Sequence, residues 1–233
     1  MTEPTSLPRP IRVVAVLFPN LTQLDFTGPA QVFSVAPPGQ IELHVAAALS
    51  APVPTYSGFA IVPTCNFATA PQADVLLVPG GTGVNQAMAD PAMLGFLRSQ
   101  AAAARYLASV CTGSLLLGAA GLLEGKRATS HWNSVDLLER FGASPVHERV
   151  VQDGNLFTGA GVSAGIDMAL TLLGELLGPD AARRAALVLE YNPQPPYVGD
   201  PTDPALAGLV AEGFTEVHAL RAGLVEQAAG FLH

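Results

Sequence analysis

The residue types best suited to covalent chemistry lie in Ser109-Val-Cys111-Thr-Gly-Ser114. The apolar run before Cys111 is typical of a buried strand, and the small residues after it are typical of a helix start. A cysteine at such a turn is held out of the sheet, as in a nucleophile elbow. The helix dipole favours its thiolate by only about 0.3–1 kcal/mol, which is less than about one pKa unit. Cys111 is therefore predicted to be a nucleophile that needs a polar partner; the alternative is a buried structural thiol.

Asp25 is the candidate partner of Cys111. It lies between Leu24 and Phe26, in the loop after a predicted strand at residues 11–18. An apolar pocket next to an anion raises a carboxyl pKa, so Asp25 would stay protonated and exchange a proton with sulfur. The alternative is that Asp25 caps a helix that opens at Gly28-Pro29.

The loop Gly80-Gly81-Thr82-Gly83 follows another predicted strand, at residues 74–78. Its backbone N–H groups can surround a developing negative charge. A phosphate site is the less favoured alternative, because the loop has neither Gly-Lys-Ser/Thr nor GxGxxG spacing. Thr112 brings a hydroxyl and an N–H next to the sulfur, or else simply starts the helix.

His131 is the most plausible histidine base. The equally weighted alternative is that His131 lies in the first turn of a helix that Ser130 caps. Cys65 is expected to be a passive small side chain. Asp167 is expected to be a polar position on a helix, with a structural hydrogen bond as the alternative. Ligand-type residues show neither i, i+4 nor CxxC spacing, so we expect no metal and no cofactor.

Composition narrows the class of protein. The chain has 233 residues, of which 49% are hydrophobic and 13% charged, and its formal net charge is −8. No basic cluster is present, so nucleic acid and anionic membranes are not expected partners. Two cysteines are too few for a disulfide framework, and the polar, proline-rich start lacks the apolar core of a secretory leader. We therefore expect a cytoplasmic protein.

The elements that must position these residues alternate along the chain. Strands are predicted at 11–18, 41–49, 74–78 and 106–110, short edge strands between 52 and 71, and a hairpin from 146–151 and 155–158. Helices are predicted at 92–104, 164–177, 181–189 and 205–232, and a strand–helix unit at 127–141. This alternation predicts an α/β, flavodoxin-like fold with a mostly parallel sheet and helices on both faces. Residues 1–233 are interpreted as one domain with a C-terminal helical extension at about 203–232. The candidate loops then meet at the carboxyl ends of the strands.

Several motifs together resemble the ThiJ/PfpI superfamily and, within it, the isocyanide hydratase family. They are Gln23-Leu-Asp25-Phe-Thr-Gly-Pro29, Pro79-Gly-Gly-Thr-Gly-Val84, Ser109-Val-Cys111-Thr-Gly-Ser114, Gly118-Ala-Ala-Gly-Leu-Leu123, Gly125-Lys-Arg-Ala-Thr-Ser-His131-Trp132, Val146-His-Glu-Arg-Val-Val151, Gly165-Ile-Asp167 and Leu189-Glu-Tyr191-Asn-Pro193. The resemblance implies a cofactor-free homodimer. It also implies that Cys111 is the nucleophile, that Asp25 is the general acid/base, and that Thr112 lines the site. The implied reaction adds water to a small apolar isocyanide, through a thioimidate on Cys111, and yields an N-substituted formamide.

Three other functions remain open on the sequence. Regulators of the AraC type carry a similar domain but add a DNA-binding module of roughly 100 residues, and only about 35 residues, acidic on balance, follow Tyr197 here. A redox sensor would use oxidation of Cys111. A glyoxalase-like member of the superfamily would act on methylglyoxal.

Overall fold

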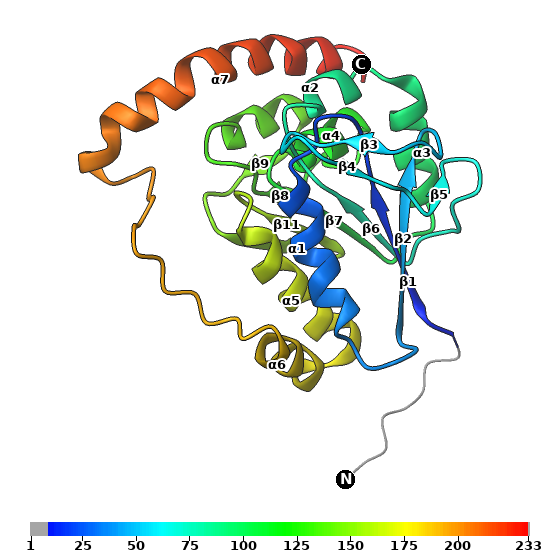
Figure 1. Cartoon of the computed structure of the whole chain (residues 1–233). Coiled ribbons are helices and arrows are strands. Elements are labelled where there is room, and N and C mark those ends of the chain that lie inside the picture. Colours follow the sequence, from blue (N-terminus) through cyan, green and yellow to red (C-terminus); the bar gives the residue numbers. More distant parts are fainter. Residues whose placement is uncertain (1–8, 233) are drawn as a thin grey trace.

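The computed structural model describes residues 9–232, and for residues 213–217 it describes only the backbone. Within that range a seven-stranded sheet forms the centre of the molecule, with helices on both of its faces (Figure 1). The strand order is β10-β11-β7-β6-β1-β2-β5, and every neighbouring pair is parallel except β10 and β11. The strands are β1 (Ile11–Val16), β2 (Ile41–Ala47), β5 (Cys65–Asn66), β6 (Val75–Val78), β7 (Tyr106–Val110), β10 (Val150–Asp153) and β11 (Leu156–Gly159). The predicted α/β fold with a mostly parallel sheet is confirmed.

The chain changes direction across the sheet between β1 and β6. It passes from β1 to β2 on one side, and then returns to place β6, β7 and β11 on the other side. This order is flavodoxin-like, and such a switch point opens a crevice at the carboxyl ends of the strands. β1 reads Ile-Arg-Val-Val-Ala-Val and is buried at every position except Arg12, as expected for a strand covered on both faces.

One face of the sheet carries α1 (Gln23–Ser34), α5 (Ala164–Leu177) and α6 (Pro179–Val188). The other face carries α2 (Val84–Ala87), α3 (Pro91–Ala101), α4 (Gly113–Ala119) and the 3-10 helix η1 (Val135–Phe141). A long extended segment then leads past the short helix η2 (Pro204–Leu206) to α7 (Ala207–Ala229), which lies across the end of the molecule near α2 (Figure 1). α7 packs on η1, α4 and α2.

The first helix begins earlier than predicted. It starts at Gln23 rather than at Gly28-Pro29, so Pro29 lies inside it. The cause is tertiary: the amide of Thr22 donates to the carbonyl of Gly80 at 2.9 Å, and this bond fixes the entry of the helix. Thr22 is the N-cap, so the alternative in which Asp25 caps the helix was wrong.

Other boundaries moved as well. The strand–helix unit predicted at 127–141 is reduced to a two-residue strand and η1, because β8 (Arg127–Ala128) pairs with β9 (Ser144–Pro145) outside the central sheet. α2 was not predicted. The excursion predicted between residues 52 and 71 is confirmed, with β3 (Val53–Pro54) and β4 (Ala60–Ile61) forming a small antiparallel hairpin.

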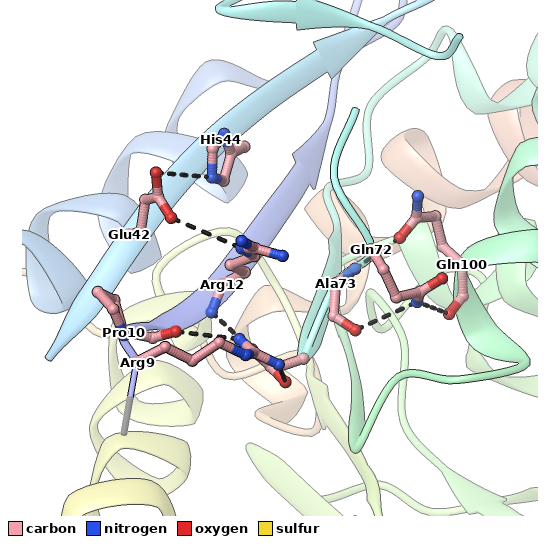
Figure 2. Close-up of polar contacts among 9 residues, drawn as sticks. Arg9, Pro10, Arg12, Glu42, His44, Gln72, Ala73 and Gln100 are labelled. Carbon is pink, nitrogen blue, oxygen red and sulfur yellow. Dashed lines mark hydrogen bonds and ion pairs between the residues drawn. The ribbon is translucent and has the colours of Figure 1, made fainter. Parts of the chain in front are cut away.

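The amino ends of the central strands are tied together at the end of the sheet away from the candidate loops. Arg9 donates to Asp74 through both terminal nitrogens, at 2.6 and 2.9 Å, and the amide of Arg12 donates to the same carboxylate at 2.8 Å (Figure 2). Gln100 on α3 accepts from the amide of Ala73 at 2.8 Å (Figure 2). These bonds hold the amino ends of β1 and β6 in place. The two strands are therefore fixed relative to each other, and so are the starts of the loops that follow them.

A search of residues 9–232 finds no helix of the length and hydropathy that crossing a membrane requires. Residues 1–8 and His233 lie outside the described residues. The expectation that the start of the chain is not a secretory leader falls mostly on these residues.

Candidate active site

Cys111 stands between β7 and α4. β7 ends at Val110, Thr112 is the N-cap of α4, and the φ angle of Cys111 is 56°. A left-handed backbone is uncommon for a residue with a side chain, and it is typical of strained functional turns. A Cβ atom at Gly113 would lie 2.1 Å from the carbonyl oxygen of Val78, so glycine is required there. The predicted strand-to-helix turn at Cys111 is confirmed.

The backbone of this turn is held from three sides. The Cys111 amide donates to the carbonyl of Gly159 at 3.0 Å. The Cys111 carbonyl accepts hydrogen bonds from Ser114 Oγ at 3.2 Å and from Ser130 Oγ at 3.1 Å. Ser130 therefore supports the turn and does not cap a helix, contrary to its predicted alternative. These bonds limit the directions in which the sulfur can point.

Asp25 reaches this turn from the first turn of α1. Its side chain is completely buried, and Oδ2 accepts a hydrogen bond from the amide of Gly80 at 2.9 Å. Oδ1 has no hydrogen-bond partner of normal geometry among the described residues. Burial raises the pKa of Asp25 to about 7, while hydrogen bonds from Gly80 and Cys111 limit the rise. At neutral pH this carboxyl therefore exists in both protonation states.

The structure brings Cys111 and Asp25 together, as the sequence analysis expected. The Cys111 side chain is 5% exposed, and its thiol lies close enough to the Asp25 carboxyl for each group to affect the pKa of the other. Burial raises the pKa of the thiol well above its usual value, and negative charge on Asp25 raises it further. The Thr112 amide, the positive charge of Arg221 and the Thr112 hydroxyl act in the opposite direction. Near neutral pH the thiol therefore keeps its proton, while the Asp25 carboxyl is partly ionised.

The loop after β6 holds these groups in place. The Gly81 amide donates to Thr112 Oγ1 at 3.0 Å, while the Gly80 amide is bound by Asp25. A Cβ at Gly80 would lie 2.5 Å from the Thr112 amide and 2.9 Å from Asp25 Oδ2. The two amides were expected to face a developing negative charge, and this expectation needs correction: in the structure both are already bonded, and they position Asp25 and Thr112.

Thr82 and Gly83 contact the loop after β1. Thr82 is exposed and its Oγ1 lies 3.5 Å from the carbonyl of Asn20, and Gly83 packs so closely on Pro19 that a Cβ would meet its carbonyl oxygen at 1.9 Å. They join the loops after β1 and β6. Their expected place in the substrate region finds no support in these contacts.

His131 lies in the segment between β8 and η1, not in a first helical turn. Its Nδ1 is 2.8 Å from Asn133 Oδ1, and a Cβ at Gly161 would lie 3.6 Å from its ring. Burial lowers the pKa of His131, and the charge of Arg221 lowers it further, so the ring is neutral at physiological pH. A neutral ring keeps one nitrogen available as a base.

The remaining candidates lie elsewhere. Cys65, on the edge strand β5, directs its sulfur at the carbonyl of Val45 at 3.7 Å. Asp167 on α5 forms an ion pair with Arg149 and accepts from Tyr191 at 3.2 Å, which is the structural role given as its alternative. Within residues 9–232 no three His, Cys, Asp or Glu side chains are grouped to hold a metal ion.

The sequence analysis missed Arg221 on α7. Its side chain is 4% exposed and its charge acts on Cys111. One signal was present in the sequence: Arg221 shares a helical face with the buried Val225 and Ala228, at i+4 and i+7. An arginine in an apolar face is seldom accidental, because buried charge is costly.

The site of this α/β fold therefore combines a thiol on a strand-to-helix turn with a buried carboxyl from the first turn of α1. The family follows from comparison with known proteins. Residues 11–175 match the model of the DJ-1/PfpI family, and the chain belongs to that family. The resemblance to the ThiJ/PfpI superfamily is thereby confirmed.

Among similar proteins, the isonitrile hydratase of Pseudomonas putida is 48% identical over 226 residues, which are 96% of this chain and 98% of that protein. A ThiJ/PfpI family protein from Pseudomonas syringae has a crystal structure with a TM-score of 0.89 and 37% identity, covering 98% of this chain and 99% of that one. The structure of Drosophila melanogaster DJ-1beta has a TM-score of 0.71 and 25% identity, covering 79% of this chain and 100% of that one. The chain is thus a homologue of an isonitrile hydratase over nearly its whole length.

Proposed function

We propose that this protein hydrates isonitriles (isocyanides) to N-substituted formamides, with Cys111 as the nucleophile and Asp25 as the general acid/base. Homology to the isonitrile hydratase over nearly the whole chain supports the substrate class. The observation that carries the mechanism is the completely buried Asp25 carboxyl, whose pKa is raised to about 7 and which interacts with the Cys111 thiol.

In the first step sulfur forms a bond to the terminal carbon of the isonitrile. The Asp25 carboxylate takes the thiol proton as the bond forms, and then delivers that proton to the same carbon. The product is a thioimidate, R–N=CH–S–Cys111, and Asp25 returns to its carboxylate form. A group whose pKa lies close to the working pH is suited to both transfers.

In the second step water attacks the thioimidate carbon. Asp25 removes a proton from the water and passes it to the imine nitrogen, which gives the tetrahedral species R–NH–CH(OH)–S–Cys111. Collapse of that species breaks the carbon–sulfur bond, releases the formamide R–NH–CHO and restores the thiol. Atoms and charge balance with thiol, carboxyl and water alone, so the proposal includes no cofactor.

The surroundings of Cys111 favour this reaction over redox sensing. A sensor cysteine needs an exposed thiol of low pKa, since thiolate and access together control oxidation. Cys111 is nearly completely buried and its pKa is raised by that burial. An isonitrile carries little charge, so a buried apolar environment disfavours it less than it disfavours peroxide or other polar reactants.

The test is to incubate the purified protein with para-nitrophenyl isocyanide and to quantify the formamide by chromatography. Wild type should convert it, Cys111→Ala should not, and Cys65→Ala should match wild type because Cys65 lies on the edge strand β5. A wild type that makes no formamide, or a Cys111→Ala variant that makes as much as wild type, would refute the proposal.

A parallel incubation with methylglyoxal addresses the glyoxalase-like alternative. Turnover of methylglyoxal without turnover of any isocyanide would assign the site to that activity. The resemblance further implies a small apolar natural substrate and a homodimer, and light scattering of the intact protein measures the oligomeric state directly.

A further inference from the structure

Arg221 is buried inside the group of elements that hold Cys111. It lies on α7, a helix that follows residues 11–175, the part matched by the family model. α7 packs on α2, α4 and η1. Asn85 lies in α2, α4 begins directly after the Cys111 turn, and Ser134 directly precedes η1. The C-terminal helix thus delivers a cation to the core of the site.

The hydrogen-bond partners of this guanidinium are neutral. Nε donates to Asn85 Oδ1 at 3.1 Å and Nη1 donates to Ser134 Oγ at 2.7 Å. No carboxylate among the described side chains lies within ion-pair distance of Arg221. The acidic side chains on the elements around Arg221 are accounted for in other ways. Asp136 pairs with His218, and Glu226 pairs with Arg140. Glu139 and Glu212 are exposed, and α2 and α4 carry no ionisable side chain.

A buried cation without a counter-charge is expensive, and one partner is normally present. The ionisable groups that interact with Arg221 across the site are Cys111 and His131, and Asp25 faces the same sulfur from α1. Of these, Asp25 is an anion when it is ionised, and Cys111 becomes anionic when it loses its proton during attack. His131 is uncharged, because its pKa is lowered.

We propose that Arg221 is a positioning residue that supplies a fixed positive charge to the Cys111 site, so that α7 completes the site electrostatically. The charge stabilises the thiolate that forms when sulfur loses its proton. Asp25 has the opposite effect while it is ionised: its negative charge raises the pKa of the Cys111 thiol, whereas the positive charge of Arg221 lowers it. The role in catalysis rests on the proposed hydration, but the effect on the thiol does not.

The same guanidinium orders the segment that leads to His131. Ser134 accepts from Arg221, so its hydroxyl is free to donate to Asn133 Oδ1 at 2.8 Å. Asn133 Oδ1 is then an acceptor for His131 Nδ1–H, at 2.8 Å. This chain of bonds connects the Arg221 guanidinium to the His131 ring.

The experiment compares two substitutions that separate charge from shape. Arg221→Lys keeps the charge, whereas Arg221→Gln removes the charge and keeps hydrogen-bonding capacity. Alkylation of Cys111 by iodoacetamide at fixed pH reports the thiolate fraction, and mass spectrometry reads Cys65 of the same molecule as an internal reference. We expect Arg221→Gln to slow alkylation of Cys111 about tenfold, which is one pKa unit, and Arg221→Lys to stay within about threefold of wild type.

Arg140→Met is the matched control. Arg140 also binds α7, through Glu226 at 3.4 Å, but its side chain is 62% exposed and its charge is not among those that act on Cys111. This variant should alkylate like wild type, which excludes a general effect of loosening α7. If Arg221→Gln does not fold, Arg221→Met, which fills a similar volume without charge, replaces it.

Equal alkylation rates in wild type and the neutral variant would overturn the proposal, and so would an equal loss in the lysine and glutamine variants. The assay uses no isonitrile, so its failure leaves the hydration proposal standing. Conversely, a protein without hydratase activity can still show the effect of Arg221 on its thiol. In turnover of para-nitrophenyl isocyanide, Arg221→Gln should lower kcat with KM unchanged, because the charge acts on sulfur and not on bound substrate.

Discussion

The amide of Gly80 donates a 2.9 Å hydrogen bond to Oδ2 of Asp25. This bond joins the first turn of α1, the helix that follows β1, to the loop after β6, at the switch point of the sheet. It satisfies one oxygen of a buried carboxyl and leaves Oδ1 without a partner of normal geometry among the described residues. Asp25 is thus fixed in place while one of its oxygens stays available for proton transfer.

Substituting Asp25 by asparagine tests that transfer. The amide oxygen of the new side chain can still accept from Gly80, but the side chain cannot carry a proton between sulfur and carbon. We expect kcat with para-nitrophenyl isocyanide to fall about 10²- to 10⁴-fold. Alkylation should still modify one Cys111 per chain, which shows that the thiol is intact; unaltered turnover would remove Asp25 from the mechanism.

The pH dependence of activity should show the titration of Asp25. Below its pKa of about 7 both the carboxyl and the thiol are protonated, and no group accepts the thiol proton. Activity should therefore rise as the pH passes upward through about 7 and then level off. A kcat/KM profile from about pH 5 to about pH 9 measures this limb, and a flat profile across that range would contradict the assignment.

The same carboxyl should reduce stability at neutral pH. Its pKa is about 7 in the folded protein against an ordinary value of 3.8, so the folded state binds the extra proton between these limits. The contribution of Asp25 to the free energy of unfolding therefore falls as the pH rises from about 4 to about 7. Asp25→Asn should be more stable than wild type at about pH 8, by a few kcal/mol at most, with the difference vanishing near about pH 4. Thermal unfolding at both pH values measures this.

Gly113 tests the geometry of the turn. Gly113→Ala places a methyl group 2.1 Å from the Val78 carbonyl oxygen, so the turn must open. We expect a loss of about 2–3 kcal/mol or more in the free energy of unfolding. Gly95→Ala is the control, since Gly95 lies in α3 with no atom near its Cβ position, and it should gain about 0.5–1 kcal/mol.

Thr112 tests the link between the turn and the loop after β6. Thr112→Val keeps the shape but leaves the buried amide of Gly81 without its 3.0 Å acceptor. Loss of such a bond costs about 1–1.5 kcal/mol, so turnover should fall roughly tenfold. Thr112→Ser keeps the hydroxyl and should retain most activity; equal activity in the valine variant would show that the bond is dispensable.

The parts of the fold that could be predicted share a local cause. The apolar runs of β1, β6 and β7 are continuous because both faces of each strand are covered, and this pattern is visible without knowing what covers them. The start of α1 could not be predicted, because a bond from Thr22 to the distant Gly80 sets it. The strand–helix unit expected at residues 127–141 shrank for a similar reason, since β9 took β8 out of the central sheet.

The candidate site divides in the same way. Cys111 was identifiable because its strand, its turn and its helix are consecutive in the chain. Ser130 and Arg221 took roles in the site that no local pattern indicated: their partners are 19 and 87 residues away. The amides of Gly80 and Gly81 were expected to face a developing negative charge, but Asp25 of α1 and Thr112 at the start of α4 accept their hydrogen bonds.

The sequence by itself determined the α/β fold and the cysteine turn, because short stretches of chain encode each of them. The tertiary structure decided the raised pKa of Asp25, the occupied glycine amides and the arrival of Arg221 from the last helix. These properties arise from burial and from charges that meet across the fold, and neither exists until the distant segments have packed together.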